Sequence, residues 1–294
     1  MRHHVWIPVV LLLIAPAVSQ LNAQQNPQHI RINRAIESLA QGRPIFGLSI
    51  SNRSVDTGKM LRSSGLDFFV IDMEHEVYDF PAVQDLLLGL REQPFSQAFI
   101  EAAKAAFPDV AVPPPTPMVK IGRLGREQIE FDVRHALKLG ALGVFIPYTE
   151  SKEEIALAVR AATKPESQYV PGLSDQDWEQ RNGPWPLNPQ GEFLIGAMIE
   201  STKGEEHIEE ILNTPGLGAV WIAHPSSEAV GRKILQMCKD RGIVAACSDY
   251  NTDHFKARLD EGYNMVFLGW DSMMFFRGLN EVLNIAKQAV DSRK

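Results

Sequence analysis

The chain has 294 residues, of which 45% are hydrophobic and 22% charged, with 21 Gly and 19 Pro. These values are typical of a globular protein and exclude a disordered, collagen-like or coiled-coil chain. The formal net charge is −7, from 29 basic and 36 acidic residues, and no block of Lys and Arg indicates a nucleic-acid partner.

The first residues have the pattern of a secretory signal peptide. A short basic start (residues 2–4) precedes an apolar run, Val5–Val18, and small residues follow it up to Ala23. The run is shorter than the roughly 20 residues that a membrane-spanning helix needs. We therefore expect residues 1–23 to be removed and residues 24–294 to form an exported protein, periplasmic or secreted, without a membrane span. An uncleaved membrane anchor is the alternative.

Short apolar, β-branched runs recur along the rest of the chain and predict eight strands. They are Ile45–Ile50, Phe68–Asp72, Met118–Ile121, Gly143–Pro147, Phe193–Glu200, Gly218–Ala223, Ile243–Cys247 and Met265–Gly269. Their continuous hydrophobicity indicates strands buried on both faces. Helices are predicted between most of them, at Asp56–Ser64, Ala82–Arg91, Glu127–Lys138, Lys152–Thr163, Lys203–Asn213, Ala229–Asp240 and Thr252–Glu261.

This alternation predicts an α/β protein with a single-domain (β/α)₈ TIM barrel. A doubly wound parallel sheet would show the same alternation and is the alternative. No G-x-G-x-x-G follows a strand and there is no Walker A motif, so a nucleotide-binding fold loses support.

Two long segments interrupt the alternation. Gln93–Pro117 contains a short Ala-rich helix (Ala98–Phe107) followed by several prolines, and Pro165–Gln190 contains Trp178 and Trp185. Loops of this length in a compact domain are usually lids, oligomer contacts or disordered segments.

The two cysteines, Cys238 and Cys247, fit neither a C-x-x-C motif nor a zinc pattern. Export would permit a disulfide between them. Because one lies in a predicted helix and the other in a predicted strand, we expect buried free thiols.

Polar side chains follow the predicted strands, and in a barrel the carboxyl ends of the strands carry the chemistry. Asp72, Glu74 and His75 lie at or just after the end of the second strand, and Lys120 and Arg123 at or just after the end of the third. Glu200 ends the fifth strand, and His224 and Ser226 follow the sixth. We expect these acidic, basic and imidazole groups to meet at one rim.

Each of these residues has a functional and a structural interpretation. An Asp72 that orients His75 would suit general acid/base chemistry, whereas Asp72 alone could cap a helix. Glu200 closes a buried strand, so it is expected to bind a metal ion or to form a salt bridge. Lys120 and Arg123 are expected to bind an anionic substrate, with surface cations as the alternative.

Four stretches resemble the HpcH/HpaI-type aldolases: Val70–Phe80, Gly125–Tyr148, Trp185–Glu200 and Pro215–Ile222. The resemblance implies a barrel enzyme that cleaves or forms 2-oxo acids, such as 4-hydroxy-2-oxo acids, with an aldehyde as the second substrate. It implies a class II mechanism, in which a divalent cation, Mg²⁺ or Mn²⁺, stabilises a pyruvate enolate. It also implies a homo-oligomer.

Matching the motifs by position implies that His75 and Asp72 transfer the proton and that Glu200 is the first metal ligand. Glu74 is expected to contact the substrate. Lys120 stands where the family has an Arg, so it keeps the charge without the bidentate contact. Arg123, one turn further on, is expected to supply a guanidinium.

The second metal ligand of the family, an Asp, is replaced by Ser226, which we expect to contact the substrate. His224 could bind the metal instead, which would favour Co²⁺, Fe²⁺ or Zn²⁺. Two main functions stay open: an exported carbon–carbon lyase, and a catalytically degenerate barrel that binds small carboxylates. A metal-independent hydrolase or lyase that uses His75 is a third.

Overall fold

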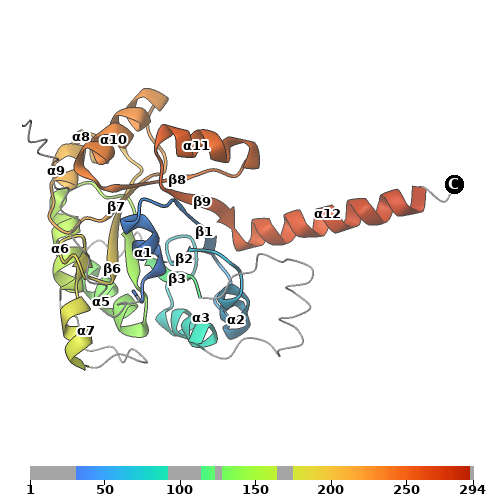
Figure 1. Cartoon of the computed structure of the whole chain (residues 1–294), viewed down its shortest axis with the longest axis horizontal. Helices are drawn as coiled ribbons and strands as arrows, with labels where there is room; N and C mark the ends of the chain where they lie inside the picture. Colours follow the sequence, from blue (N-terminus) through green and yellow to red (C-terminus); the bar gives the residue numbers. More distant parts are fainter. Residues whose placement is uncertain (1–30, 92–113, 123–127, 164–174, 292–294) are drawn as a thin grey trace, which may run out of the picture. The chain divides into compact units, whose positions relative to one another are not determined.

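The computed structural model describes residues 31–91, 114–122, 128–163 and 175–291, and these form a closed parallel barrel (Figure 1). Its strands pair in the order β1 (Ile45–Ile50), β2 (Phe68–Asp72), β3 (Thr116–Lys120), β4 (Gly143–Ile146), β6 (Phe193–Ile199), β7 (Ala219–Ile222), β8 (Val244–Ser248) and β9 (Met265–Trp270). Parallel pairing of β9 with β1 closes the ring, and a two-residue strand, β5 (Pro184–Trp185), pairs with β6. The predicted (β/α)₈ barrel is confirmed, and the doubly wound alternative is wrong.

Helices connect the strands on the outside of the barrel (Figure 1). They are α2 (Val55–Arg62), α3 (Phe80–Arg91), α5 (Ile129–Leu139), α6 (Lys152–Ala162), α8 (Thr202–Glu206), α9 (Ile208–Leu212), α10 (Glu228–Arg241) and α11 (Phe255–Glu261). Ser side chains cap the first turns of α2, α8 and α10. Gly140, Gly242 and Gly262 end α5, α10 and α11 in the left-handed conformation.

Most predicted helices are found near their predicted bounds, with two corrections. The predicted helix Lys203–Asn213 is interrupted at His207, which separates α8 from α9. The predicted helix Thr252–Glu261 begins with a 3₁₀ turn (Thr252–His254) before α11. Three helices were not predicted: α1 (Arg34–Ala40), α7 (Asp175–Arg181) and α12 (Asp271–Asp291).

Aromatic side chains fill the inside of the barrel. The rings of Trp221 and Phe267 stack with centroids 3.6 Å apart, and Phe145 and Phe68 pack edge-on against this pair. At the amino-terminal end, the side-chain amide of Asn33, the cap of α1, donates to the carbonyls of Leu142 and Glu192. The barrel is therefore packed through its centre, and its polar rim at the carboxyl ends of the strands is left for chemistry.

Both cysteines are buried free thiols, as expected. Burial raises the pKa of Cys238 and of Cys247 to about 12, which makes both unreactive. The predicted signal peptide and the predicted helix Ala98–Phe107 lie outside the described residues. In the part of the chain that the structure describes, no helix is long and apolar enough to cross a membrane.

Two glycines let α2 and α3 approach closely. A Cβ atom added at Gly89 would lie 1.9 Å from the carbonyl oxygen of Val55, and one at Gly58 would lie 2.1 Å from that of Leu86. Because backbone atoms stand at these positions, neither contact can be relieved by a side-chain rotation.

Gly89→Ala is therefore expected to lower the free energy of unfolding by about 1–3 kcal/mol, although Ala is the better helix former. The matched control is Gly278→Ala in α12, where nothing lies within 4 Å of an added Cβ. Urea denaturation measures both variants. If the two variants had equal urea midpoints, the stability of the protein would not depend on the close approach of α2 and α3.

Candidate functional site at the carboxyl ends of the strands

Asp72 holds both the backbone and the imidazole of the loop that follows β2. Its side chain is 1% exposed. Oδ1 accepts the N–H groups of Glu74 and His75 at 2.8 and 3.0 Å, and Oδ2 lies 2.8 Å from Nδ1 of His75. Asp72 thus orients His75 as predicted, whereas it caps a loop rather than a helix, because α3 begins only at Phe80.

Lys120, at the end of β3, is buried at the centre of this group. Its side chain is 3% exposed, and Nζ lies 2.8 Å from Oδ2 of Asp72 and 3.0 Å from Oε2 of Glu74. The same atom is 3.0 Å from Nδ1 of His75. Lys120 is therefore not a surface cation. Burial raises the pKa of Asp72, but the Lys120 charge and the hydrogen bonds from His75 and Lys120 outweigh it and hold this pKa below its usual range.

Glu200 follows β6 and faces the same group. Its Oε2 accepts the N–H of Tyr148 at 3.0 Å, and Tyr148 takes a left-handed conformation (φ 47°) that a non-glycine residue rarely adopts. Burial raises the pKa of Glu200 and the charge of Glu74 adds to this, while the Tyr148 N–H, Lys120 and His224 act in the opposite direction. The ends of β2, β3, β6 and β7 therefore bring their charged groups together.

The remaining predicted residues are placed differently. His224 is exposed after β7. Ser226 donates its N–H and its Oγ–H to the two carboxylate oxygens of Glu205 in α8, both at 2.6 Å. Its role as a substrate contact stays a prediction. Arg123 lies outside the described residues.

Glu200 and His224 are the candidate ligands for a divalent cation. Within the described ranges, no group of three His, Cys, Asp or Glu side chains could hold a metal ion. Glu200 is nevertheless a buried carboxylate close to a second one, Glu74, whose Oε2 pairs with Nζ of Lys120 at 3.0 Å. Mg²⁺ commonly binds through one or two carboxylates and completes its shell with water. Among the described residues, a hard cation would therefore find one carboxylate, Glu200, and would need water for most of its shell.

Sequence reasoning missed four residues around the site. Tyr148 supplies a backbone N–H to Glu200, Glu205 binds Ser226, and Tyr78 donates its hydroxyl hydrogen to Asp132 in α5. Tyr78 lies within Val70–Phe80, one of the stretches that resemble the family, and this was a signal that could have identified it. No spacing pattern pointed to Asp132, which is 54 residues away.

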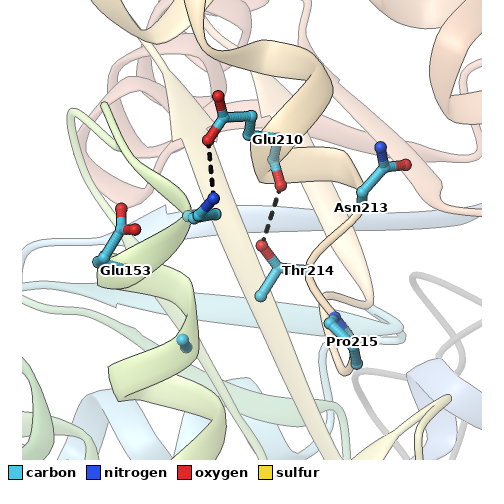
Figure 2. A pocket seen from close by; sticks show the side chains of 7 residues that line it. Glu153, Glu210, Asn213, Thr214 and Pro215 are labelled. Carbon is cyan, nitrogen blue, oxygen red and sulfur yellow. Dashed lines mark hydrogen bonds and ion pairs between the residues drawn. The ribbon is translucent and has the colours of Figure 1, made fainter.

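A cavity of about 510 Å³ lies elsewhere, between α6 and the turn after α9 (Figure 2). Lys152 forms an ion pair with Glu210 there at 3.1 Å, and the Thr214 hydroxyl donates to the Glu210 carbonyl. None of the predicted site residues lines this cavity.

A closed parallel barrel with buried acidic and basic side chains at its strand ends is the arrangement of a barrel enzyme. The chain belongs to the HpcH/HpaI aldolase/citrate lyase family, whose model matches residues 46–226. Aldolases of this family generally depend on a divalent metal.

Among its relatives is the hydroxypyruvate/pyruvate aldolase of Paraburkholderia phytofirmans, 23% identical over 83% of this chain and 94% of the relative. The 2-dehydro-3,6-dideoxy-6-sulfogluconate aldolase of Pseudomonas putida is 23% identical over 83% and 92%. A family protein from Burkholderia cenocepacia has the same fold, with a TM-score of 0.66 and 22% identity over 87% of this chain and 99% of that one. These relatives support a lyase function on 2-oxo acids.

Lys120→Met is expected to lower the free energy of unfolding at pH 7 by about 3–5 kcal/mol, because it leaves Asp72 and Glu74 buried without their cation. The low pKa of Asp72 stabilises the fold above the unfolded-state pKa of about 3.9, and this contribution is lost as the pH falls through the folded-state value. The difference in the free energy of unfolding between the wild type and the variant should therefore become smaller as the pH is lowered.

Denaturant titrations from pH 7 to pH 3 measure this, with Lys233→Met on the exposed face of α10 as the control. A difference that stays constant over this range would show that the Lys120 charge does not act through Asp72.

Proposed function

We propose that this protein is a carbon–carbon lyase that cleaves or forms 2-oxo acids, such as 4-hydroxy-2-oxo acids, with an aldehyde as the second substrate. The observation that carries the proposal is the 2.8 Å contact between His75 and the buried Asp72, at a rim that also holds Lys120. The family and its aldolase relatives support the same reaction class.

In this proposal His75 moves the proton. When Nδ1–H donates to Asp72, Nε2 carries the lone pair, and the side chain is 62% exposed and open to a substrate. Nε2 removes the proton from the hydroxyl group of the aldol, the bond between C3 and C4 breaks, and the aldehyde leaves, while the electrons of that bond form the enolate of the 2-oxo fragment. Return of the proton to C3 gives the shorter 2-oxo acid and restores the neutral imidazole. Asp72 keeps its negative charge because of its low pKa, so it stabilises the imidazolium that forms.

Lys120 supplies the fixed positive charge of the site. Its ammonium group lies among carboxylates at 2.8 and 3.0 Å, which hold it in one position. A charge that is already oriented costs no reorganisation when the enolate oxygen becomes negative. Glu74, Arg123 and Ser226 are the proposed further contacts to the substrate.

We also propose that Glu200, with His224 as a second ligand, is where a divalent cation would bind. Oxygen ligation by Glu200 suits Mg²⁺ or Mn²⁺, and ligation by His224 would favour Co²⁺, Fe²⁺ or Zn²⁺. When bound, such an ion supplies a Lewis acid for the 2-oxo group and its enolate.

A second candidate is a barrel that binds small carboxylates without catalysis. The observation that favours it is the hydrogen bond between the neutral side chain of Ser226 and Glu205. In this proposal, Ser226 stands where the family has a metal-binding Asp. Lys120, which stands where the family has an Arg, also favours this second candidate.

His75→Gln is expected to lower kcat for cleavage of a 4-hydroxy-2-oxo acid by about 10²–10⁴-fold, because it removes the base and leaves the rest of the rim. Pyruvate release measures the reaction, and calorimetry with pyruvate measures binding, which should persist. His254→Gln is the control, an exposed histidine paired with Asp249 away from the proposed base. A wild-type protein that binds pyruvate but cleaves no 2-oxo acid, with or without added metal ions, would favour the carboxylate-binding barrel.

The proposal includes export, because residues 1–23 have the pattern of a signal peptide. A mature protein that still begins at Met1 would contradict it.

We further propose that the protein is a homo-oligomer held together by α12. None of the 21 residues of α12 is buried, and Phe275 and Phe276 are 65% and 60% exposed. On the barrel, the outward side chains Phe46 and Leu48 of β1 and Leu268 of β9 are only half-buried, whereas β2, β3, β4, β6 and β7 are buried throughout. Within the described residues, the apolar face of α12 thus covers no surface, and no helix covers the strip of the barrel formed by Phe46, Leu48 and Leu268.

The join between β9 and α12 explains why the chain does not cover its own strip. β9 ends at Trp270 and α12 begins at Asp271, so no loop reverses the direction of the chain. Asp271 also accepts the N–H groups of Ser51 and Asn52, which fixes the start of α12. A second copy can cover the strip with its own α12, and in a two-fold dimer both strips are covered.

Phe276→Asp is expected to convert the oligomer to monomers, because it places a charge on the apolar face of α12 that the partner would bury. Light scattering after size-exclusion chromatography measures the mass, and Gln288→Asp on the same helix is the control. A wild-type protein that is monomeric at micromolar concentration would contradict the proposed interface.

A further inference from the structure

The loop that carries Glu74 and His75 is fixed at its start by Asp72, and the His75 ring, which Asp72 holds at Nδ1, is 62% exposed. The loop spans Met73 to Asp79, between β2 and α3. Its first part is tied down by the bonds to Asp72 and by the N–H of Met73, which donates to the carbonyl of Lys120. The position of His75 therefore also depends on what holds the far end of the loop.

Tyr78 is the side-chain contact at that far end, next to Val77, whose carbonyl accepts from the Arg53 guanidinium at 2.6 Å. Its hydroxyl donates to Oδ1 of Asp132, a carboxyl group that is 0% exposed in the first turn of α5. Oδ2 of Asp132 has no hydrogen-bond partner among the described residues. Burial raises the pKa of Asp132, and the Tyr78 hydroxyl acts against this. This buried acid is costly to leave without a donor, so the Tyr78 hydroxyl is strongly bound.

The ring of Tyr78 makes a second contact at the end of β3. It lies over Gly122, two residues after Lys120, where an added Cβ would be 3.0 Å from Cδ2 of the ring. It also packs edge-on against Phe80, with centroids 5.4 Å apart. One side chain therefore joins the loop to the end of β3, to α3 and to α5.

We propose that Tyr78 is a positioning residue, which fastens the loop carrying Glu74 and His75 across the end of β3 through Asp132 and Gly122. Its effect on catalysis rests on the proposed role of His75 in proton transfer, whereas its effect on the loop does not. Tyr78 itself acts through His75 and has no chemical step of its own.

The experiment compares Tyr78→Phe with two changes of its partner. In Tyr78→Phe, amide hydrogen exchange in residues 73–79 is expected to become about tenfold faster, and kcat to fall about three- to tenfold with KM within twofold of wild type. Asp132→Leu removes the acceptor and should reproduce both effects without lowering the melting temperature, since no buried carboxyl group is left unpaired. Asp132→Asn keeps an acceptor oxygen and should resemble wild type in exchange and in kcat.

Tyr250→Phe is the matched control, another half-exposed tyrosine of the rim, next to Trp270. Unchanged exchange in both Tyr78→Phe and Asp132→Leu would overturn the proposal. Faster exchange with an unchanged kcat would also overturn it, because the loop would then be loosened without moving His75. If the wild-type protein cleaves no 2-oxo acid, the proposed function fails, and the exchange measurements still decide whether Tyr78 fastens the loop.

Discussion

The site depends on one buried carboxylate, Asp72, which four hydrogen-bonding groups share. Its two oxygens accept two backbone N–H groups, lie against the imidazole of His75 and pair with the ammonium of Lys120. A carboxylate with this many partners stays ionised, and an ionised group in this place fixes both a base and a cation. The strand β2 brings Asp72 to the rim, so the geometry of the site is set by the barrel itself.

Lys at position 120 makes different contacts with the neighbouring side chains than an Arg would make there. A compact ammonium group reaches Asp72, Glu74 and His75 at 2.8, 3.0 and 3.0 Å. Nδ1 of His75 cannot donate to Asp72 and accept from Lys120 at the same time, so the two contacts describe alternative proton positions. Only the arrangement with Nδ1–H on Asp72 leaves a base at Nε2, and the pairing of Lys120 with both carboxylates favours it.

The sequence predicted the barrel well because its strands are buried on both faces, which makes continuous apolar runs such as Phe68–Asp72 easy to recognise. It also predicted that Asp72, Lys120 and Glu200 lie at strand ends, since strand ends follow directly from those runs. It could not predict the pairing of Tyr78 with Asp132 or of Ser226 with Glu205, because these contacts join separate elements through the packing of helices on the barrel. The helix α12 was missed, and in this chain it has no buried face.

The aromatic layer inside the barrel provides an apolar surface directly below the charged rim. Phe145 lies beside Lys120 in the register of β3 and β4, and it packs against Trp221, which stacks on Phe267. An aromatic layer is poorly polarisable compared with water, so it screens the charges next to it weakly. Asp72, Lys120, Glu74 and Glu200 therefore behave as one electrostatic unit, in which the arrival of an anionic ligand would be felt at every member.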